Sequence, residues 1–199
     1  MESLFKFKSL ILGIFGVFFL AVLALVVIEI SNQSRAQIAI IKEVPAFEFT
    51  ERNGNSFGKT EMLGKINIVN FFFTSCQGPC PFMNSKVAEL YKKYSNTDRV
   101  QFVSISVDPQ RDSLEVLKNY AQRFGAVDNR WLFLRGKLSE VQELTEKGFL
   151  LGGELPNLHS TKLVLVDQSG FIRGYYSCYD EESLNLLTAH VRELLRKEK

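Results

Sequence analysis

Short apolar runs alternate with helical periodicities along most of this chain. Residues 66–73 (INIVNFFF) and 100–107 (VQFVSISV) are rich in β-branched and aromatic residues, which is typical of buried strands. A helical spacing of apolar positions follows each run, at Val87, Leu90, Tyr91 and Tyr94 and then at Leu114, Leu117, Tyr120 and Phe124. The pattern therefore predicts the order strand, helix, strand, helix.

Residue types that favour helix starts mark where these helices begin. Pro81 suits a first helical position because its fixed φ and missing N–H cost nothing there. Asp112 with Glu115 resembles a capping box for the second helix. Ser139 with Gln142 could cap a further helix, after a short strand at 131–134.

Two further segments alternate as hairpins do. Residues 46–58 contain the turn signal Asn53-Gly54, and residues 162–166 and 171–176 flank a short polar turn. Residues 148–156 are expected to be a loop. Asp180 is expected to cap a last helix, whose apolar positions are Leu184, Leu187, Val191 and Leu195.

An alternating half followed by an antiparallel hairpin and a helix indicates an α/β fold. Strands joined by helices pair in parallel, whereas a hairpin adds antiparallel strands. We therefore expect one thioredoxin-like mixed sheet with helices on both faces. No internal repeat and no second globular domain are visible in the pattern.

The N-terminal segment stands apart, because residues 9–28 are uncharged and strongly apolar. Twenty helical residues extend about 30 Å, the thickness of a bilayer's hydrocarbon core. We expect a transmembrane anchor at 9–30, with residues 1–8 in the cytoplasm because Lys6 and Lys8 precede the span. A cleaved signal peptide is the alternative, although the apolar run is longer than usual for one.

The anchor hypothesis divides the rest of the chain in two. Residues 31–44 are more polar and are expected to be a linker, and residues 45–199 form the thioredoxin-like domain. That domain would lie outside the cytoplasm, on the periplasmic side of a bacterial membrane or in the mitochondrial intermembrane space.

The composition is typical of a packed domain, and the charge content argues against some kinds of binding partner. The 199 residues are 46% hydrophobic and 23% charged, which is too apolar for a disordered chain. The net charge is only +2 and no long run of Lys or Arg occurs. We therefore expect no nucleic-acid partner and no polybasic membrane patch.

Two of the three cysteines lie close together at a chemically favoured place. Cys76 and Cys80 directly follow the strand expected at 66–73, at the sheet edge where α/β proteins bind ligands. They also border a helix N-terminus, whose partial positive charge favours thiolates. Both sulfurs are therefore expected to be reactive or to bind a metal, the alternative being a local disulfide of little consequence.

The spacing of the pair and one histidine favour a copper site. Three residues separate Cys76 from Cys80, where thioredoxin-type redox enzymes have two, and the wider loop can direct both sulfurs to one metal. His159 precedes the strand at 162–166 on the same predicted edge, whereas His190 falls within the last helix. Two thiolates and an imidazole suit Cu(I), and Cu(II) with added ligands; zinc is the alternative metal.

These residues carry a family resemblance. Residues 73–81 (FTSCQGPCP), 104–109 (SISVDP) and 159–160 (HS) resemble the Sco/SenC family of membrane-anchored copper proteins. The resemblance implies that Cys76, Cys80 and His159 are copper ligands. It also implies a metallochaperone that assists assembly of the dinuclear copper centre of cytochrome c oxidase. Its partners would be the copper-bearing oxidase subunit and a copper donor protein.

Two residues have open roles. Asp108 ends the strand at 100–107 and could orient His159 from outside the metal's ligand set, or could simply open a turn with Pro109. Cys178 departs from the family pattern, since similar proteins often have a small residue without a thiol there. We expect it to be dispensable for metal binding.

A copper metallochaperone would not be a turnover enzyme. Two other functions are alternatives to it. Cys76 and Cys80 could form the redox pair of a thiol–disulfide reductase that acts on the cysteines of a copper protein, and such exchange needs no His159. A peroxidase of the peroxiredoxin kind is less favoured. The threonine expected three residues before its reactive cysteine is replaced by Phe73 relative to Cys76 and by Gln77 relative to Cys80.

Overall fold

The computed structural model describes residues 16, 18–25, 38–152 and 160–196. The chain divides into two compact units, Met1–Ile38 and Ala39–Lys199. In the first unit, residues 16 and 18–25 are helical. Within the described residues, no helix combines the length and the apolar character needed to cross a bilayer. Most of the span predicted at 9–30 lies outside the described part of the chain.

The second unit is built on one eight-stranded mixed sheet with the order β1-β8-β7-β4-β5-β6-β2-β3. The strands are β1 (Lys42–Glu43), β2 (Glu48–Glu51), β3 (Ser56–Gly58), β4 (Ile66–Phe72), β5 (Val100–Ser106), β6 (Trp131–Arg135), β7 (Lys162–Val166) and β8 (Phe171–Ser177). Pairing is parallel from β4 through β5 to β6 and antiparallel elsewhere. This confirms the predicted mixed sheet.

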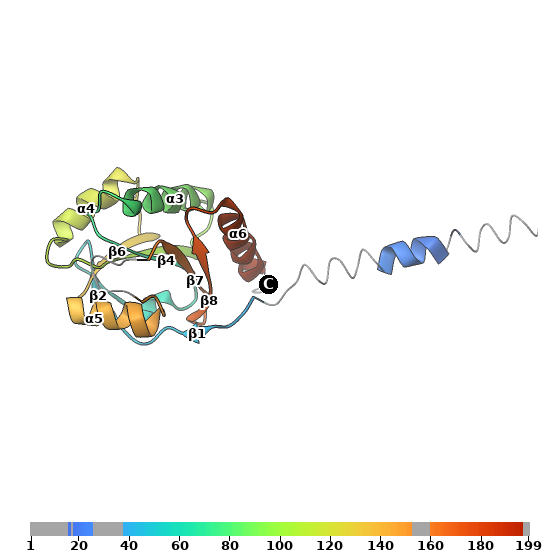
Figure 1. Ribbon diagram of the computed structural model, residues 1–199, viewed down its shortest axis with the longest axis horizontal. Coiled ribbons are helices and arrows are strands. Elements are labelled where there is room, and N and C mark those ends of the chain that lie inside the picture. Colours follow the sequence, from blue (N-terminus) through green and yellow to red (C-terminus); the bar gives the residue numbers. More distant parts are fainter. Residues whose placement is uncertain (1–15, 17, 26–37, 153–159, 197–199) are drawn as a thin grey trace, which may run out of the picture. The chain divides into compact units, whose positions relative to one another are not determined.

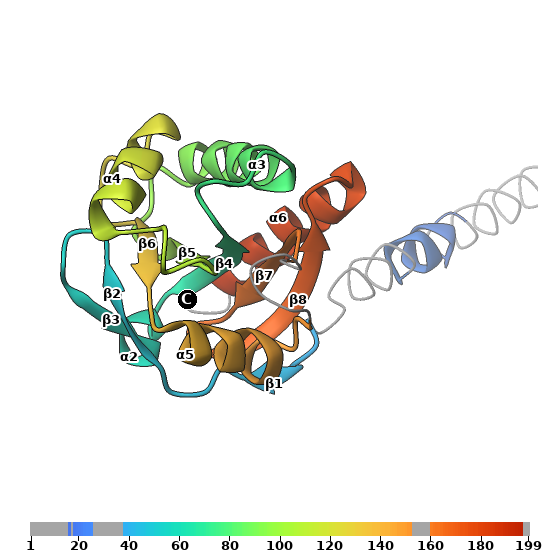
Figure 2. The same cartoon turned by 60° about the vertical axis from the view of Figure 1, so that its left-hand side comes forward.

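Helices cover both faces of the sheet, as expected (Figures 1 and 2). They are α2 (Lys59–Met62), α3 (Pro79–Lys93), α4 (Leu114–Arg123), α5 (Leu138–Glu143) with the π-helical turn η1 (Leu144–Gly148), and α6 (Glu181–Arg196). In both views α3 and α4 lie on one side of the sheet and α5 lies on the other. α6 approaches α3, since the Tyr94 hydroxyl donates to the Thr188 carbonyl at 3.5 Å.

The central strand β4 is mostly apolar, with Asn67 and Asn70 as its polar residues, because it is buried on both faces. It lies between β5 and β7, and all seven of its residues are buried. Successive side chains of a strand point to opposite faces. Phe71 accordingly packs edge-on against Phe149 at 5.2 Å, whereas Phe72 stacks on Tyr120 of α4 at 5.1 Å. The strand thus joins the two core layers just before the cysteines.

Three predicted helix starts were wrong. α3 begins at Pro79 rather than Pro81, so Cys80 belongs to its first turn. α4 is capped by Ser113, whose side chain accepts the backbone N–H of Val116 at 3.3 Å, and not by Asp112. α5 follows Lys137 without a side-chain cap, so Ser139 caps nothing. The differences are one to three residues, and residue type alone rarely fixes a helix start more closely.

Other local predictions are confirmed. The turn between β2 and β3 contains Gly54 at φ +90°, a conformation that favours glycine. Asp180 caps α6 by accepting the backbone N–H of Glu182 at 3.1 Å. By contrast, the prediction of a linker over 31–44 was wrong at its end, because Lys42 and Glu43 form β1, which pairs with β8 and extends the sheet.

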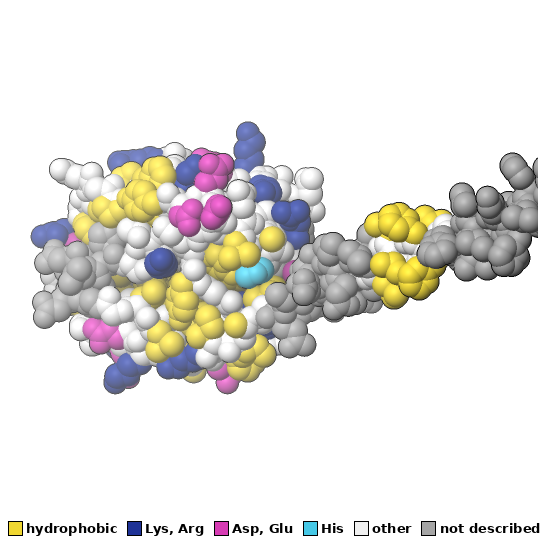
Figure 3. Space-filling view, turned by 45° about the vertical axis from the view of Figure 1, so that its right-hand side comes forward, with side chains coloured by type: hydrophobic (Ala, Val, Ile, Leu, Met, Phe, Trp, Pro, Cys, Tyr) yellow, Lys and Arg dark blue, Asp and Glu magenta, His cyan; other side chains and the backbone are white. Residues whose placement is uncertain are grey.

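Figure 3 shows that positive and negative side chains are mixed on the visible side of the sheet domain. Lys and Arg side chains lie among Asp and Glu side chains and scattered hydrophobic ones. Several of the charges are paired, for example Lys86 with Glu89 at 3.1 Å and Arg130 with Asp128 at 2.8 Å. Such a surface agrees with the low net charge of the sequence.

Candidate metal centre

The loop that carries the cysteines connects the end of β4 to α3. The backbone N–H of Cys76 donates to the Phe73 carbonyl at 3.3 Å, which turns the chain immediately after the strand. Gly78 occupies the N-cap position of α3, with Pro79 and Cys80 as the first two helical residues. Both cysteines therefore lie at the carboxyl end of the central strand, as predicted.

The two thiols are adjacent but differ in exposure. Both are reduced; Cys76 is half-buried and Cys80 is fully buried. The Cys76 side chain and the backbone of Phe73 both lie near enough to the Cys80 thiol to change its pKa. Cys76 is therefore the more accessible of the two cysteines, and Cys80 is enclosed by the protein.

Burial decides the protonation of Cys80. Its pKa is raised to about 12, chiefly because burial disfavours the charged thiolate; the N–H of Phe73 acts in the opposite direction, and Cys76 and Asp112 add to the increase. For Cys80, the prediction that a helix N-terminus would favour the thiolate was wrong, because loss of solvation on burial raises the pKa of this thiol. A metal or a disulfide partner must displace the proton of this sulfur.

A buried carboxylate that the sequence analysis assigned to a helix cap holds the cysteine loop instead. Asp112 is fully buried and accepts the Thr74 hydroxyl at 2.5 Å and the Ser106 hydroxyl at 2.5 Å. It also accepts the backbone N–H of Thr74 at 3.2 Å. Asp112 therefore joins the start of the cysteine loop to the end of β5.

Asp108 lies at the same sheet edge but contacts a different partner. Its carboxylate pairs with the guanidinium of Arg111 at 3.1 Å. Its carbonyl accepts the backbone N–H groups of Arg111 and Asp112 at 3.1 and 3.0 Å, so the residue opens a turn. The predicted contact between Asp108 and His159 stays a prediction, because His159 lies outside the described part of the chain.

His159 falls in the range 153–159, which the structure does not describe. The description resumes at Ser160, just before β7, and β7 is antiparallel to β4. Ser160 therefore lies toward the carboxyl end of β4, where the cysteine loop starts. Among the described residues, no three His, Cys, Asp or Glu side chains group closely enough to hold a metal ion.

The other histidine, His190, has a packing role. His190 of α6 is hydrogen-bonded through Nδ1 to the Tyr176 hydroxyl at 2.6 Å, and the two rings meet edge to face. Burial lowers the pKa of His190 and keeps its ring neutral at physiological pH.

The end of the C-terminal hairpin lies closer to the cysteine loop than its sequence position suggests. Cys178 is fully buried, and its backbone N–H donates to the Thr161 carbonyl at 3.4 Å. The next residue, Tyr179, stacks on Phe82 in the first turn of α3, with ring centroids 4.8 Å apart. Burial raises the pKa of Cys178, so this third thiol stays protonated.

Asp112 is the functional candidate that sequence reasoning missed. The available signal was its position four residues after Asp108, within the segment that follows β5. The contact between its carboxylate and the cysteine loop could not be predicted from sequence alone, because the two residues are 38 positions apart in the chain.

Comparisons with known proteins bear on this site. The sequence model of the SCO1/SenC family matches residues 36–196. The SCO1 protein homolog of Bacillus subtilis is 31% identical over 143 residues, covering 68% of this chain and 74% of that protein.

Two solved structures share the fold. BsSco, described as a member of the Sco family of cytochrome c oxidase assembly proteins with a disulfide switch, has a TM-score of 0.69 and 26% identity, covering 76% of this chain and 92% of that one. Yeast Sco1 with copper bound has a TM-score of 0.64 and 25% identity, covering 76% and 90%.

Proposed function

Because this chain belongs to the SCO1/SenC family, we propose that it is a copper metallochaperone that holds copper through Cys76, Cys80 and His159. One observation carries the proposal: Cys76, in the turn after β4, and Cys80, in the first turn of α3, lie close enough together at the carboxyl end of β4 for Cys76 to raise the pKa of Cys80. Two sulfurs so close together can bind one soft ion without rearrangement of the fold. The copper-bound structure of yeast Sco1 supports the choice of metal.

The recipient follows from the family's described role. BsSco belongs to a family of cytochrome c oxidase assembly proteins, so the copper-bearing subunit of that oxidase is the proposed acceptor, and a copper donor protein is the proposed source. Cys76 is the half-buried member of the pair and is the sulfur through which copper would pass to a partner. Asp112 keeps the loop in place while that exchange occurs.

The test of the ligand set is His159→Ala in the full-length protein. Two thiolates can still hold Cu(I), which accepts two ligands, whereas Cu(II) prefers more donors and nitrogen among them. We expect Cu(II) affinity to fall by about two orders of magnitude and Cu(I) affinity to fall less, as measured by competition with chelators. An unchanged Cu(II) affinity and an unchanged visible spectrum would show that His159 is not a copper ligand.

His190→Ala is the matched control, because it removes the other histidine of the chain. This residue contacts Tyr176 rather than the cysteine loop. We expect lower stability from the lost hydrogen bond but the wild-type copper stoichiometry and spectrum.

Thiol–disulfide exchange is the second candidate function, and the disulfide switch described for BsSco favours it. Cys76 would attack a partner's disulfide and form a mixed disulfide, releasing one partner thiolate. Cys80 would then attack Cys76, release the second partner thiolate and leave a Cys76–Cys80 disulfide. His159→Ala would retain this exchange, so the two functions separate in one variant.

Cys178→Ser is expected to retain the full copper stoichiometry. Cys178 is a buried, protonated thiol and forms no group of three metal-binding side chains among the described residues. Copper bound per chain, measured by elemental analysis, checks this. Loss of copper would mean that the ligand set is misassigned.

We also propose that residues 9–30 anchor the protein in a membrane, with the thioredoxin-like domain outside the cytoplasm. The uncharged run at 9–28 and the preceding lysines support this orientation. A reporter fused after Lys199 should be exported and should stay with membranes through a high-salt wash. Recovery of a shortened soluble protein would instead indicate a cleaved signal peptide.

A further inference from the structure

Two exposed aromatic rings lie stacked beside the cysteine loop. Phe82, in the first turn of α3, and Tyr179, just after β8, have ring centroids 4.8 Å apart and ring planes within 7° of parallel. Phe82 is 41% exposed and Tyr179 is 58% exposed. Large aromatic side chains are mostly buried in folded proteins, so a pair that stacks in contact with solvent is an apolar surface open to a partner. We call these two rings the aromatic platform.

Both rings belong to segments that border the candidate metal centre. Phe82 follows Cys80 by two residues on the same helix. Tyr179 lies two residues beyond β8, whose last residue pairs with the first residue of β7 at the same end of the sheet. A protein that reacts with the half-buried Cys76 must bring its own sulfur to that sulfur, and a protein interface of ordinary size then extends over the surrounding residues. The aromatic platform is therefore within reach of such a partner.

A groove leads away from the platform between α3 and α6. Its volume is about 400 Å³, and the two rings of the platform line it together with residues of both helices. Along α3 the lining residues extend from Phe82 to Lys93, which is about 16 Å of helix. Beyond Lys93 the helices meet, since the Tyr94 hydroxyl donates to the Thr188 carbonyl at 3.5 Å. The groove therefore offers space for a partner's side chain next to the platform.

The charged side chains around the platform are balanced in sign. Lys86 lies over the Phe82 ring, with Nζ 5.7 Å from the ring centroid, and it pairs with Glu89 at 3.1 Å. The groove is lined by one further lysine, Lys93, and one further carboxylate, Glu181. Equal numbers of opposite charges give little attraction for a partner of one sign. The group that this surface recognises is therefore apolar.

We propose that the aromatic platform is the docking surface for the copper-bearing acceptor protein, and that it takes an apolar side chain adjacent to that protein's cysteines. Aromatic side chains of this kind are the usual anchors of protein interfaces. This docking role rests on the proposal that Cys76 is the working thiol that a partner reaches. The platform then selects the partner, whereas the sulfurs carry out the exchange.

Mixed-disulfide formation by Cys76 measures docking separately from thiol chemistry. The full-length Cys80→Ser/Cys178→Ser protein keeps Cys76 as its only thiol. The Cys76 thiolate attacks one sulfur of a disulfide, a mixed disulfide forms, and the other sulfur leaves as a thiolate. The protein probe is the copper-binding domain of the oxidase subunit with its cysteines joined as a disulfide. The small probe is hydroxyethyl disulfide, which is uncharged and too small to cover the platform.

Phe82→Ala and Tyr179→Ala, each placed in this background, are expected to slow the reaction with the acceptor domain about tenfold, because each removes half of the aromatic anchor. Neither should change the rate with hydroxyethyl disulfide, and neither should change copper affinity when placed in the wild-type chain. The reaction with the acceptor domain should depend little on salt, since the charges around the platform balance. Mass spectrometry of acid-quenched samples gives both rates.

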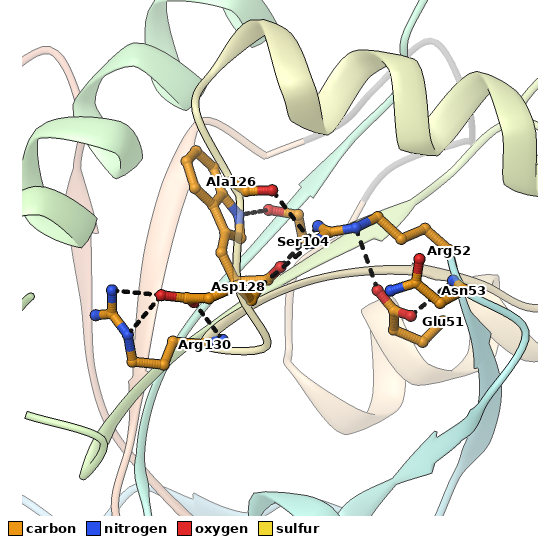
Figure 4. Close-up of polar contacts among 8 residues, drawn as sticks. Glu51, Arg52, Asn53, Ser104, Ala126, Asp128 and Arg130 are labelled. Atoms are coloured by element: carbon orange, nitrogen blue, oxygen red, sulfur yellow. Dashed lines mark hydrogen bonds and ion pairs between the residues drawn. The ribbon is translucent and has the colours of Figure 1, made fainter.

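Val127→Ala is the control for losing an exposed apolar side chain elsewhere. Val127 is 85% exposed and follows α4, which lies on the other side of α3 from α6 (Figures 1 and 2). Its neighbours are held without it, since the Arg52 guanidinium donates to the carbonyls of Ala126 at 3.2 Å and of Asp128 at 3.3 Å (Figure 4). This substitution should change neither rate.

Several results would overturn the docking role. These are an unchanged rate with the acceptor domain in Phe82→Ala and Tyr179→Ala, equal slowing with hydroxyethyl disulfide or in Val127→Ala, and no reaction of the background protein with the acceptor domain. Oxidative labelling of the two rings identifies a different occupant. Protection that rises with protein concentration alone would assign the platform to a second copy of this chain. Protection in lipid nanodiscs but not in detergent would assign it to a lipid surface.

Failure of docking and failure of copper delivery give different results. If the wild-type chain binds no copper but Phe82→Ala slows the reaction with the acceptor domain, the metallochaperone function fails and the docking surface is supported. If copper binds and the rate is unchanged, the docking surface fails and the copper proposal is unaffected.

Discussion

Replacing either Cys76 or Cys80 by serine is expected to abolish copper binding and thiol–disulfide exchange together. Each substitution removes one of two sulfurs that lie side by side at the end of β4. A serine hydroxyl is a hard donor that does not ionise at neutral pH, so it replaces the thiolate neither for copper nor in a disulfide. We expect a fall of at least about three orders of magnitude in Cu(I) affinity.

The two variants should differ in one respect that follows from burial. Cys80→Ser leaves the half-buried Cys76, which can still form a mixed disulfide with a partner but cannot resolve it. Cys76→Ser leaves only the fully buried Cys80, so no mixed disulfide should accumulate. Chelator competition gives the copper affinity, and non-reducing electrophoresis with a thiol-reactive partner gives the trapped species.

Cys178→Ser is the control for both variants, because it removes the third thiol of the chain and should retain copper and exchange. Wild-type copper affinity in either Cys76→Ser or Cys80→Ser would falsify the proposed site. Mixed disulfides that accumulate equally in the two variants would contradict the assignment of Cys76 as the accessible thiol.

The central strands could be predicted from sequence because they are short, mostly apolar and bounded by polar residues, whereas the polar β1 lies in the segment expected to be a linker. β4 and β5 lie within the predicted ranges 66–73 and 100–107, and the two hairpins occur where turn residues indicated them. A buried parallel strand must be apolar on both faces, which leaves a strong signal in the sequence. The mixed sheet and the position of Cys76 and Cys80 at its edge follow from these strands.

The polar interior could not be predicted in the same way. Asn70, Asn84 and Ser104 are fully buried, yet their residue types are common in loops and caps. Their partners lie 14 to 36 residues away in the sequence, and only the packed sheet brings them together. The raised pKa of Cys80 has the same origin, since burial is a property of the fold rather than of the neighbouring residues.

Asp112 illustrates how a local signal can mislead. Its spacing to Glu115 suits a capping box, but the adjacent Ser113 takes the cap. This leaves the Asp112 carboxylate free to reach the cysteine loop at Thr74 and the end of β5 at Ser106. A single residue of difference in the helix start thus changes the role of the carboxylate from local capping to long-range support of the site.

Asp112→Asn is therefore expected to lower the free energy of unfolding of the reduced, copper-free protein by about 3 kcal/mol, because hydrogen bonds to a buried charged group are worth about 1.5–3 kcal/mol each and are not additive. One carboxylate oxygen becomes an amide that must donate, and it then faces the donors of Thr74 or Ser106. The loop should loosen, and Cu(II) affinity should fall about tenfold.

Asp108→Asn is the matched comparison, because it makes the same chemical change at the same sheet edge. Asp108 pairs with Arg111, whose side chain is 71% exposed, so the expected loss is under about 1 kcal/mol with copper affinity unchanged. Urea denaturation and chelator competition measure both quantities in the two variants. A larger effect at Asp108 than at Asp112 would contradict the assignment of Asp112 as the carboxylate that supports the cysteine loop. The present geometry predicts the opposite order because Asp112 alone of the two accepts hydrogen bonds from the loop itself.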